Sequence, residues 1–109
     1  MPGYSGYEFL TMSTSGGVGL VTLNRPDRMN AFIQAMHREF QDLMLEISED
    51  AEVRAVVITG AGRAFCAGGD LDDMKDATTR KGPRVMEGSR RLPHAILSVK
   101  QPIICAVNG

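Results

Sequence analysis

An apolar run that ends in a glycine-rich turn is the feature that most constrains this fold. Ala55-Val56-Val57-Ile58 has the composition of a buried strand, and Thr59-Gly60-Ala61-Gly62 follows it directly. The next segment, Ala64-Phe65-Cys66-Ala67-Gly68-Gly69-Asp70, leads from this turn into a short helix predicted to begin at Asp70. Backbone N–H groups at the carboxyl end of such a strand can bind an anion, or an oxygen that becomes one during a reaction.

Strand and helix signals alternate before this turn. Tyr7 to Ser13 and Val18 to Leu23 predict two strands, and Ser15-Gly16-Gly17 between them predicts a hairpin. Asn30 occupies the position of a helix N-cap, and the helix that follows is predicted to end near Ser48. Its buried face is given by apolar residues at helical spacing, namely Phe32, Ala35, Met36, Phe40, Leu43, Met44 and Ile47.

The second half of the chain predicts two further strands. Val53 to Thr59 and Pro102 to Val107 are apolar enough to be buried on both faces, which is typical of parallel strands. Asp76 to Gly82 is predicted as a loop. Arg84 to Val99 is predicted as helical, either as one helix or as two short helices interrupted at Pro93. A strand, a crossover helix and a second strand form a parallel unit, so the predicted class is α/β.

Composition excludes several classes of function. The chain has 109 residues, at most one domain, and 12 Lys and Arg against 13 Asp and Glu, so no overall charge favours nucleic acid. No apolar stretch approaches the roughly 20 residues that span a bilayer, and the first residues lack the pattern of a secretory signal. Cys66 and Cys105 fit no metal-binding spacing and are predicted to be reduced thiols in a cytoplasmic protein.

The last residues predict that more protein follows. Ile103 to Val107 is a core strand, and Asn108-Gly109 is a turn that leads onward. A parallel strand of this kind needs a helix over each face. We therefore expect residues 1–109 to be the N-terminal part of a single, longer domain.

Three spaced motifs, at residues 21–31, 56–71 and 100–109, together resemble the crotonase superfamily, the enoyl-CoA hydratases and isomerases. Val21-Thr22-Leu23-Asn24-Arg25-Pro26, followed by Asn30-Ala31, resembles the opening of that family. Val56-Val57-Ile58-Thr59-Gly60 leading to Ala64-Phe65-Cys66-Ala67-Gly68-Gly69-Asp70-Leu71 is similar to its first oxyanion-hole segment. Lys100-Gln101-Pro102-Ile103-Ile104-Cys105-Ala106-Val107-Asn108-Gly109 resembles the strand before its second oxyanion-hole segment.

The resemblance implies a crotonase-like ββα spiral fold, of which this chain is the incomplete N-terminal part. It implies an enzyme that binds an acyl-CoA thioester and stabilises an enolate oxyanion with two backbone N–H groups. The first donor corresponds to Gly69, and the second, with the catalytic acid or base, lies beyond Gly109. The implied residues that bind substrate and coenzyme A are Arg28, Met29, Ala64, Ala67, Gly68, Gly69, Asp70, Leu71 and Asp72. The loop from Arg25 to Met29 is implied as the other wall of the coenzyme A site.

The resemblance also bears on cofactors and assembly. Coenzyme A enters as part of the substrate, and we expect no other cofactor and no metal. Family members are usually homotrimers or homohexamers, so we expect one of these assemblies for the whole protein. A non-catalytic relative that binds acyl-CoA or a partner protein is the alternative function, and an unrelated nucleotide-binding module is a third.

Several single features have competing interpretations. Gly60 to Phe65 begins like a dinucleotide-binding fingerprint, but Phe65 occupies the third glycine position, which disfavours that site. Asp70 fits a helix N-cap better than a catalytic acid, and Cys66 fits a small buried thiol better than a nucleophile. His37 is predicted at the surface, and His94 has no evident partner. A solvated face is favoured over phosphate contacts for the basic cluster Arg80, Lys81, Arg84, Arg90 and Arg91.

Overall fold

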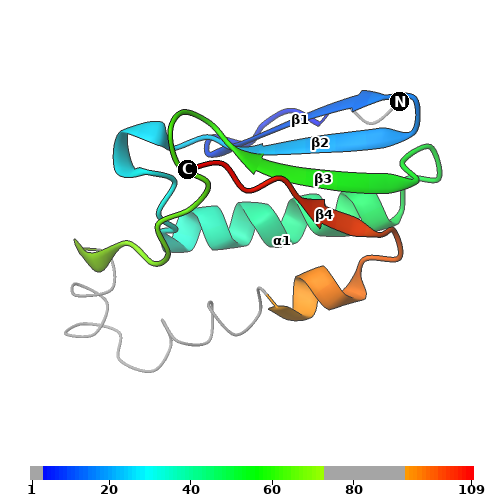
Figure 1. Ribbon diagram of the computed structural model, residues 1–109. Helices are drawn as coiled ribbons and strands as arrows, with labels where there is room; N and C mark the ends of the chain where they lie inside the picture. Colours follow the sequence, from blue (N-terminus) through cyan, green and yellow to red (C-terminus); the bar gives the residue numbers. More distant parts are fainter. Residues whose placement is uncertain (1–3, 73–92) are drawn as a thin grey trace.

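A four-stranded sheet with one long helix on one face forms the body of the chain (Figure 1). The computed structural model describes residues 4–72 and 93–109. The strands lie in the order β1 (Leu10–Ser15), β2 (Val18–Leu23), β3 (Ala55–Gly60) and β4 (Ile103–Cys105). β1 and β2 are antiparallel, whereas β2, β3 and β4 are mutually parallel. The predicted hairpin and the predicted parallel strands are therefore confirmed.

The strand ends differ from the prediction where backbone groups find other partners. β2 has the predicted bounds. β1 begins at Leu10 rather than Tyr7, because the N–H groups of Glu8 and Phe9 donate to the Glu39 carboxylate at 2.9 Å each. β3 begins at Ala55, two residues later than predicted. β4 is shorter than predicted at both ends.

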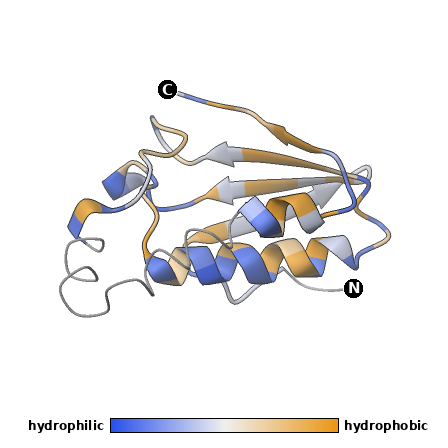
Figure 2. Cartoon of the chain, turned by 90° about the horizontal axis from the view of Figure 1, so that it is seen from below, coloured by the Kyte–Doolittle hydropathy of each residue, from blue (hydrophilic) through white to orange (hydrophobic). Residues whose placement is uncertain are grey.

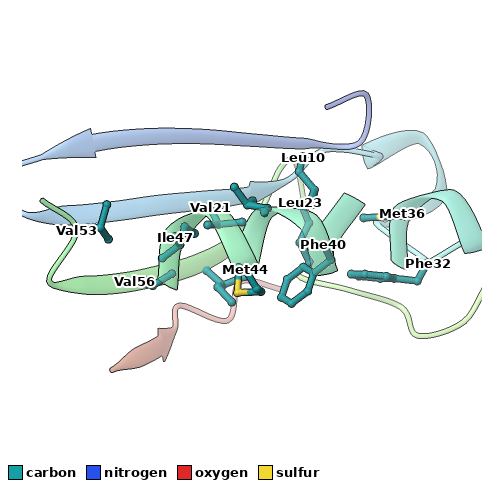
Figure 3. Packing of buried hydrophobic residues seen from close by; sticks show 12 residues of the cluster. Leu10, Val21, Leu23, Phe32, Met36, Phe40, Met44, Ile47, Val53 and Val56 are labelled. Carbon is teal, nitrogen blue, oxygen red and sulfur yellow. The ribbon is translucent and has the colours of Figure 1, made fainter. Parts of the chain in front are cut away.

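The hydrophobic core lies between the sheet and helix α1 (Gln34–Ser48), which connects β2 to β3 (Figure 3). Figure 2 shows the alternating hydrophilic and hydrophobic bands along this helix. The helix ends at Ser48, as predicted, and all its buried residues were predicted from helical spacing. The core joins Met36, Phe40, Leu43, Met44 and Ile47 of α1 to Leu10, Val21, Leu23, Val56 and Ile58 of the sheet.

The opposite face of the sheet is only partly buried, which corrects the prediction of strands buried on both faces. Residues alternate along β3 between buried and half-buried. Val18 and Leu20 are 39% exposed, and Ile104 on β4 is 58% exposed. The reason is that α1 packs against one face alone, and no other helix covers the second face within residues 4–72 and 93–109.

Other predicted elements are only partly within the described residues. The predicted loop at 76–82 and residues 84–92 of the predicted helical region lie outside them. Residues 93–98 are helical, so helix is present at and after Pro93. No helix in the described part of the chain is long and apolar enough to cross a bilayer.

Two tyrosines in the segment before β1 make hydrogen bonds to carboxylates on and just beyond α1. The Tyr7 hydroxyl donates to Glu46, and the Tyr4 hydroxyl donates to Asp50 just beyond the helix. Burial and then the hydrogen bond to Glu46 raise the pKa of Tyr7 well above its ordinary value of 10.0. Burial and the hydrogen bond to Asp50 raise the pKa of Tyr4 in the same way. Both hydroxyls therefore stay protonated in the fold.

This arrangement predicts a loss of stability at alkaline pH. The folded pKa is raised, so the stabilisation is complete below pH 10 and is lost as the pH rises from there toward the folded value. We expect the double variant Tyr4→Phe/Tyr7→Phe to lose less free energy of unfolding between pH 9 and pH 11 than the unmodified protein. Urea unfolding at the two pH values measures the difference. Equal losses in both proteins would contradict the prediction.

Candidate functional site

The turn after β3 folds back tightly on the end of the strand. A Cβ atom at Gly60 would lie 2.4 Å from the Ala64 carbonyl oxygen and 2.5 Å from that of Phe65. Both atoms belong to the backbone and cannot move aside as a flexible side chain would. Gly60 is therefore required for the close approach that brings the segment from Ala64 to Asp70 back over the carboxyl end of β3.

Asn30 holds this turn against the loop that follows β2. Its side chain is fully buried and accepts a hydrogen bond from the Arg25 N–H at 2.7 Å. Its amide nitrogen donates to the carbonyls of Ala61 at 3.0 Å and Ala64 at 2.8 Å. One side chain thus satisfies backbone groups from two segments that are distant in sequence, which leaves the two loops fixed relative to each other.

The predicted role of Asn30 as a helix N-cap is wrong. Helix α1 begins at Gln34, and Ile33 occupies the N-cap position without a side-chain cap. Asn30 instead has a φ of +57°, a left-handed conformation that Asn tolerates better than most residues. A short polar residue before an apolar helical pattern fits either role, and only the long-range partners distinguish them.

Asn108 holds the end of β3 from the other side. Its side-chain oxygen accepts from the Gly60 N–H at 3.1 Å, and its nitrogen donates to the carbonyls of Gly60 at 2.9 Å and Gly62 at 3.1 Å. The sequence predicted only a turn at this position. The missed signal is an Asn directly after the last predicted strand, where its amide can pair with the end of a neighbouring parallel strand.

An isolated parallel bridge between Phe32 and Gly69 positions the glycine segment. The Phe32 N–H donates to the Gly68 carbonyl at 2.8 Å, and the Asp70 N–H donates to the Phe32 carbonyl at 2.9 Å. The Gly68 carbonyl and the Gly69 N–H share one planar trans peptide, so they point in opposite directions. The Gly69 N–H is therefore directed away from Phe32.

The Gly69 N–H differs from the N–H groups of Gly68 and Asp70, which both have hydrogen-bond acceptors. Gly69 is exposed, and its N–H donates to no acceptor within residues 4–72 and 93–109. The preceding Gly68 has a φ of +99°, which explains a glycine there, whereas Gly69 is not among the described residues with positive φ. The N–H of Gly68 donates to the Cys66 sulfur at 3.4 Å.

A buried ion pair joins the two loops next to this bridge. The guanidinium Nη1 of Arg25 lies 2.9 Å from a carboxylate oxygen of Asp70, and the same nitrogen donates to the Ala31 carbonyl at 2.8 Å. The side chains of Arg25 and Asp70 are 15% and 8% exposed. Residues 71 and 72 are helical, so Asp70 lies where the sequence predicted a helix to begin. Its ion pair was not predicted, because Arg25 is 45 residues away.

A pocket of about 420 Å³ lies beside the exposed glycine. The segment that follows β2 forms one wall and the segment that follows β3 forms the other. Arg28 and Asp72 face each other across it at 3.6 Å, both largely exposed. The lining residues are Asp27, Arg28, Met29, Ala31, Arg63, Ala67, Gly69, Asp70, Leu71 and Asp72.

The structure brings together seven of the nine residues predicted to bind substrate. Ala64 and Gly68 do not line the pocket, because their carbonyl oxygens accept hydrogen bonds from Asn30 and Phe32. Asp27 also lines the pocket and lies in the loop from Arg25 to Met29 that the resemblance implied as a wall, whereas the prediction missed Ala31 and Arg63. These residues line the pocket because of the way the two loops fold, and no sequence motif marks them as pocket residues.

The remaining polar candidates lie elsewhere. His37 is half-buried rather than at the surface, with its ring centroid 5.0 Å from that of Phe32. Cys66 is half-buried beside the glycine turn, and Cys105 is exposed on β4. In the part of the chain that the structure describes, His, Cys, Asp and Glu form no group suited to a metal. The predicted basic cluster at 80–91 lies outside those residues.

Comparison with known proteins decides the family. A profile described as enoyl-CoA hydratase/isomerase matches residues 13–109. The chain belongs to that family. The 1,2-epoxyphenylacetyl-CoA isomerase of Escherichia coli K12 is 37% identical over 106 residues, which cover 94% of this chain and 40% of the relative. The short-chain-enoyl-CoA hydratase of Clostridium acetobutylicum is 35% identical over 99 residues, which cover 90% and 38%.

Solved structures of the enoyl-CoA hydratase/isomerase family share this fold. An enoyl-CoA hydratase from Bacillus anthracis has a TM-score of 0.87 at 30% identity, covering 94% of this chain and 40% of that one. An enoyl-CoA hydratase/carnithine racemase from Magnetospirillum magneticum has a TM-score of 0.89 at 28% identity, covering 97% and 41%. The predicted crotonase-like fold is confirmed, and the chain spans about 40% of the length of the relatives it matches.

Proposed function

We propose that the whole protein is an enoyl-CoA hydratase or isomerase that stabilises a thioester enolate through backbone N–H donors. Gly69 supplies one donor. The observation that carries this proposal is the direction of the Gly69 N–H, which is turned away from Phe32 at an exposed residue lining a pocket. When a thioester is converted to its enolate, negative charge gathers on the carbonyl oxygen. A donor held rigidly at that oxygen lowers the barrier because it needs no rearrangement as charge develops.

The walls of the pocket support coenzyme A as the carrier. Arg28 and Arg63 line the pocket from the two different loops, and guanidinium pairs well with phosphate oxygens. Met29 and Leu71 are 42% and 79% exposed, and they offer apolar surface to an aliphatic chain. An acyl-CoA combines these features, with phosphates at one end and a thioester carried on a flexible chain at the other.

Ligand titration of the whole protein tests the proposal. A short-chain 2-enoyl-CoA at 100 times its Kd is expected to stabilise the folded protein by about 2.7 kcal/mol, and NAD at the same concentration is expected to leave it unchanged. Loss of the conjugated enoyl absorbance, or migration of the double bond, is expected with the same compound. Binding without turnover would favour the non-catalytic relative, and stabilisation by NAD alone would overturn the proposal.

A further inference from the structure

We infer that Arg25 is a positioning residue for the Gly69 donor, an inference that rests on the proposed function. Arg25 is not among the residues that line the pocket. Its guanidinium nevertheless bonds to both segments that form the Phe32–Gly69 bridge. One bond reaches Ala31, the residue before Phe32, and the other reaches Asp70, the residue after Gly69.

The position of the guanidinium is itself determined by the backbone of its loop. The Arg25 N–H donates to the Asn30 side chain at 2.7 Å, and its carbonyl accepts from the N–H groups of Arg28 at 3.1 Å and Asn30 at 2.9 Å. With its backbone held in this way, the side chain reaches across to Asp70. The loop after β2 therefore determines where the segment after Gly69 can lie.

Backbone hydrogen bonds attach the Gly69 segment to the loop after β2 at three points. The Ala67 N–H donates to the Met29 carbonyl at 3.0 Å, and Gly68 and Asp70 each make one hydrogen bond to Phe32. The Arg25–Asp70 pair adds a further attachment immediately beyond the donor, and its burial keeps it from being screened by water. Together with the backbone hydrogen bonds on both sides of Gly69, this side-chain attachment keeps the Gly69 N–H in one direction while charge develops on a substrate oxygen.

Steady-state kinetics of the whole protein with a short-chain 2-enoyl-CoA test this inference. Arg25→Lys keeps the charge, but its nitrogen falls one bond short of the Nη1 position, so it cannot make both contacts in the same geometry. We expect kcat per folded molecule to fall about tenfold, with KM changed by less than threefold, because donor alignment matters most in the transition state. Arg25→Met is expected to lose more.

Two further variants separate positioning from general stability and from the proposed function. Glu39→Gln weakens a carboxylate of α1 that accepts from the N–H groups of Glu8 and Phe9 and does not line the pocket, so it should lower stability and leave kcat unchanged. An unchanged kcat in Arg25→Lys, or an equal loss in Glu39→Gln, overturns the inference. If Arg25→Met does not fold, the kinetics of Arg25→Lys alone test the inference.

A fully active Gly69→Pro variant would refute the proposed function. An inactive Gly69→Pro variant together with a normal Arg25→Lys variant would refute only the positioning role.

Discussion

Replacing Gly69 with proline in the whole protein is expected to lower turnover of a 2-enoyl-CoA by about 10²- to 10³-fold. Proline has no N–H, so the variant removes the donor proposed to stabilise the enolate oxygen, and loss of one such donor typically has this effect. The fold should tolerate the loss of the hydrogen, because the Gly69 N–H donates to no acceptor in residues 4–72 and 93–109. Circular dichroism and kinetics on the same preparation measure both effects.

Gly69→Ala is the matched control. It retains the N–H, and Gly69 is not among the residues with positive φ, so alanine fits the backbone conformation. We expect this variant to keep turnover within about tenfold of the unmodified protein, a loss below the range for an absent donor. Equal and small effects of proline and alanine would exclude the oxyanion role for this amide.

Replacing Asn30 with alanine is expected to destabilise the fold by about 4 kcal/mol or more. The change leaves the Arg25 N–H and the carbonyls of Ala61 and Ala64 without their partner, and each unsatisfied buried group costs about 1–3 kcal/mol. The φ of +57° adds about 1–2 kcal/mol for alanine. Urea unfolding monitored by circular dichroism measures the loss.

Two further substitutions divide this loss into its causes. Asn30→Gly removes the same hydrogen bonds but accepts the left-handed backbone, so it should be less damaging than alanine. Asn30→Asp keeps an acceptor for the Arg25 N–H and loses both donors. A cost below about 1 kcal/mol for Asn30→Ala would mean that water replaces these partners and that Asn30 does not hold the two loops.

Local patterns predicted the elements well. The bounds of β2 and the end of α1 at Ser48 follow from residue alternation and helical spacing, because each depends on side chains a few positions apart. The strands at 53–59 and 102–107 were predicted as buried on both faces because their composition allows it. Composition does not determine how many helices pack on them, and Ile104 is exposed on a face that no helix covers within residues 4–72 and 93–109.

Long-range polar contacts at the site were not predictable in the same way. Seven of the nine residues that the resemblance implied for binding line one pocket, since the motifs themselves form its walls. The side chains that hold those walls bond to partners 31 to 48 residues away, as Asn30 does to Ala61 and Asn108 to Gly60. No spacing rule links such residues, so one was assigned a helix cap and the other a simple turn.

The shared peptide plane at Gly68 and Gly69 couples the helix to the exposed amide. The N–H of Phe32 holds one end of that plane, and α1 begins only two residues later at Gln34. A displacement of the start of the helix would therefore reach the amide through Phe32, which connects the apolar core under the sheet to the pocket wall.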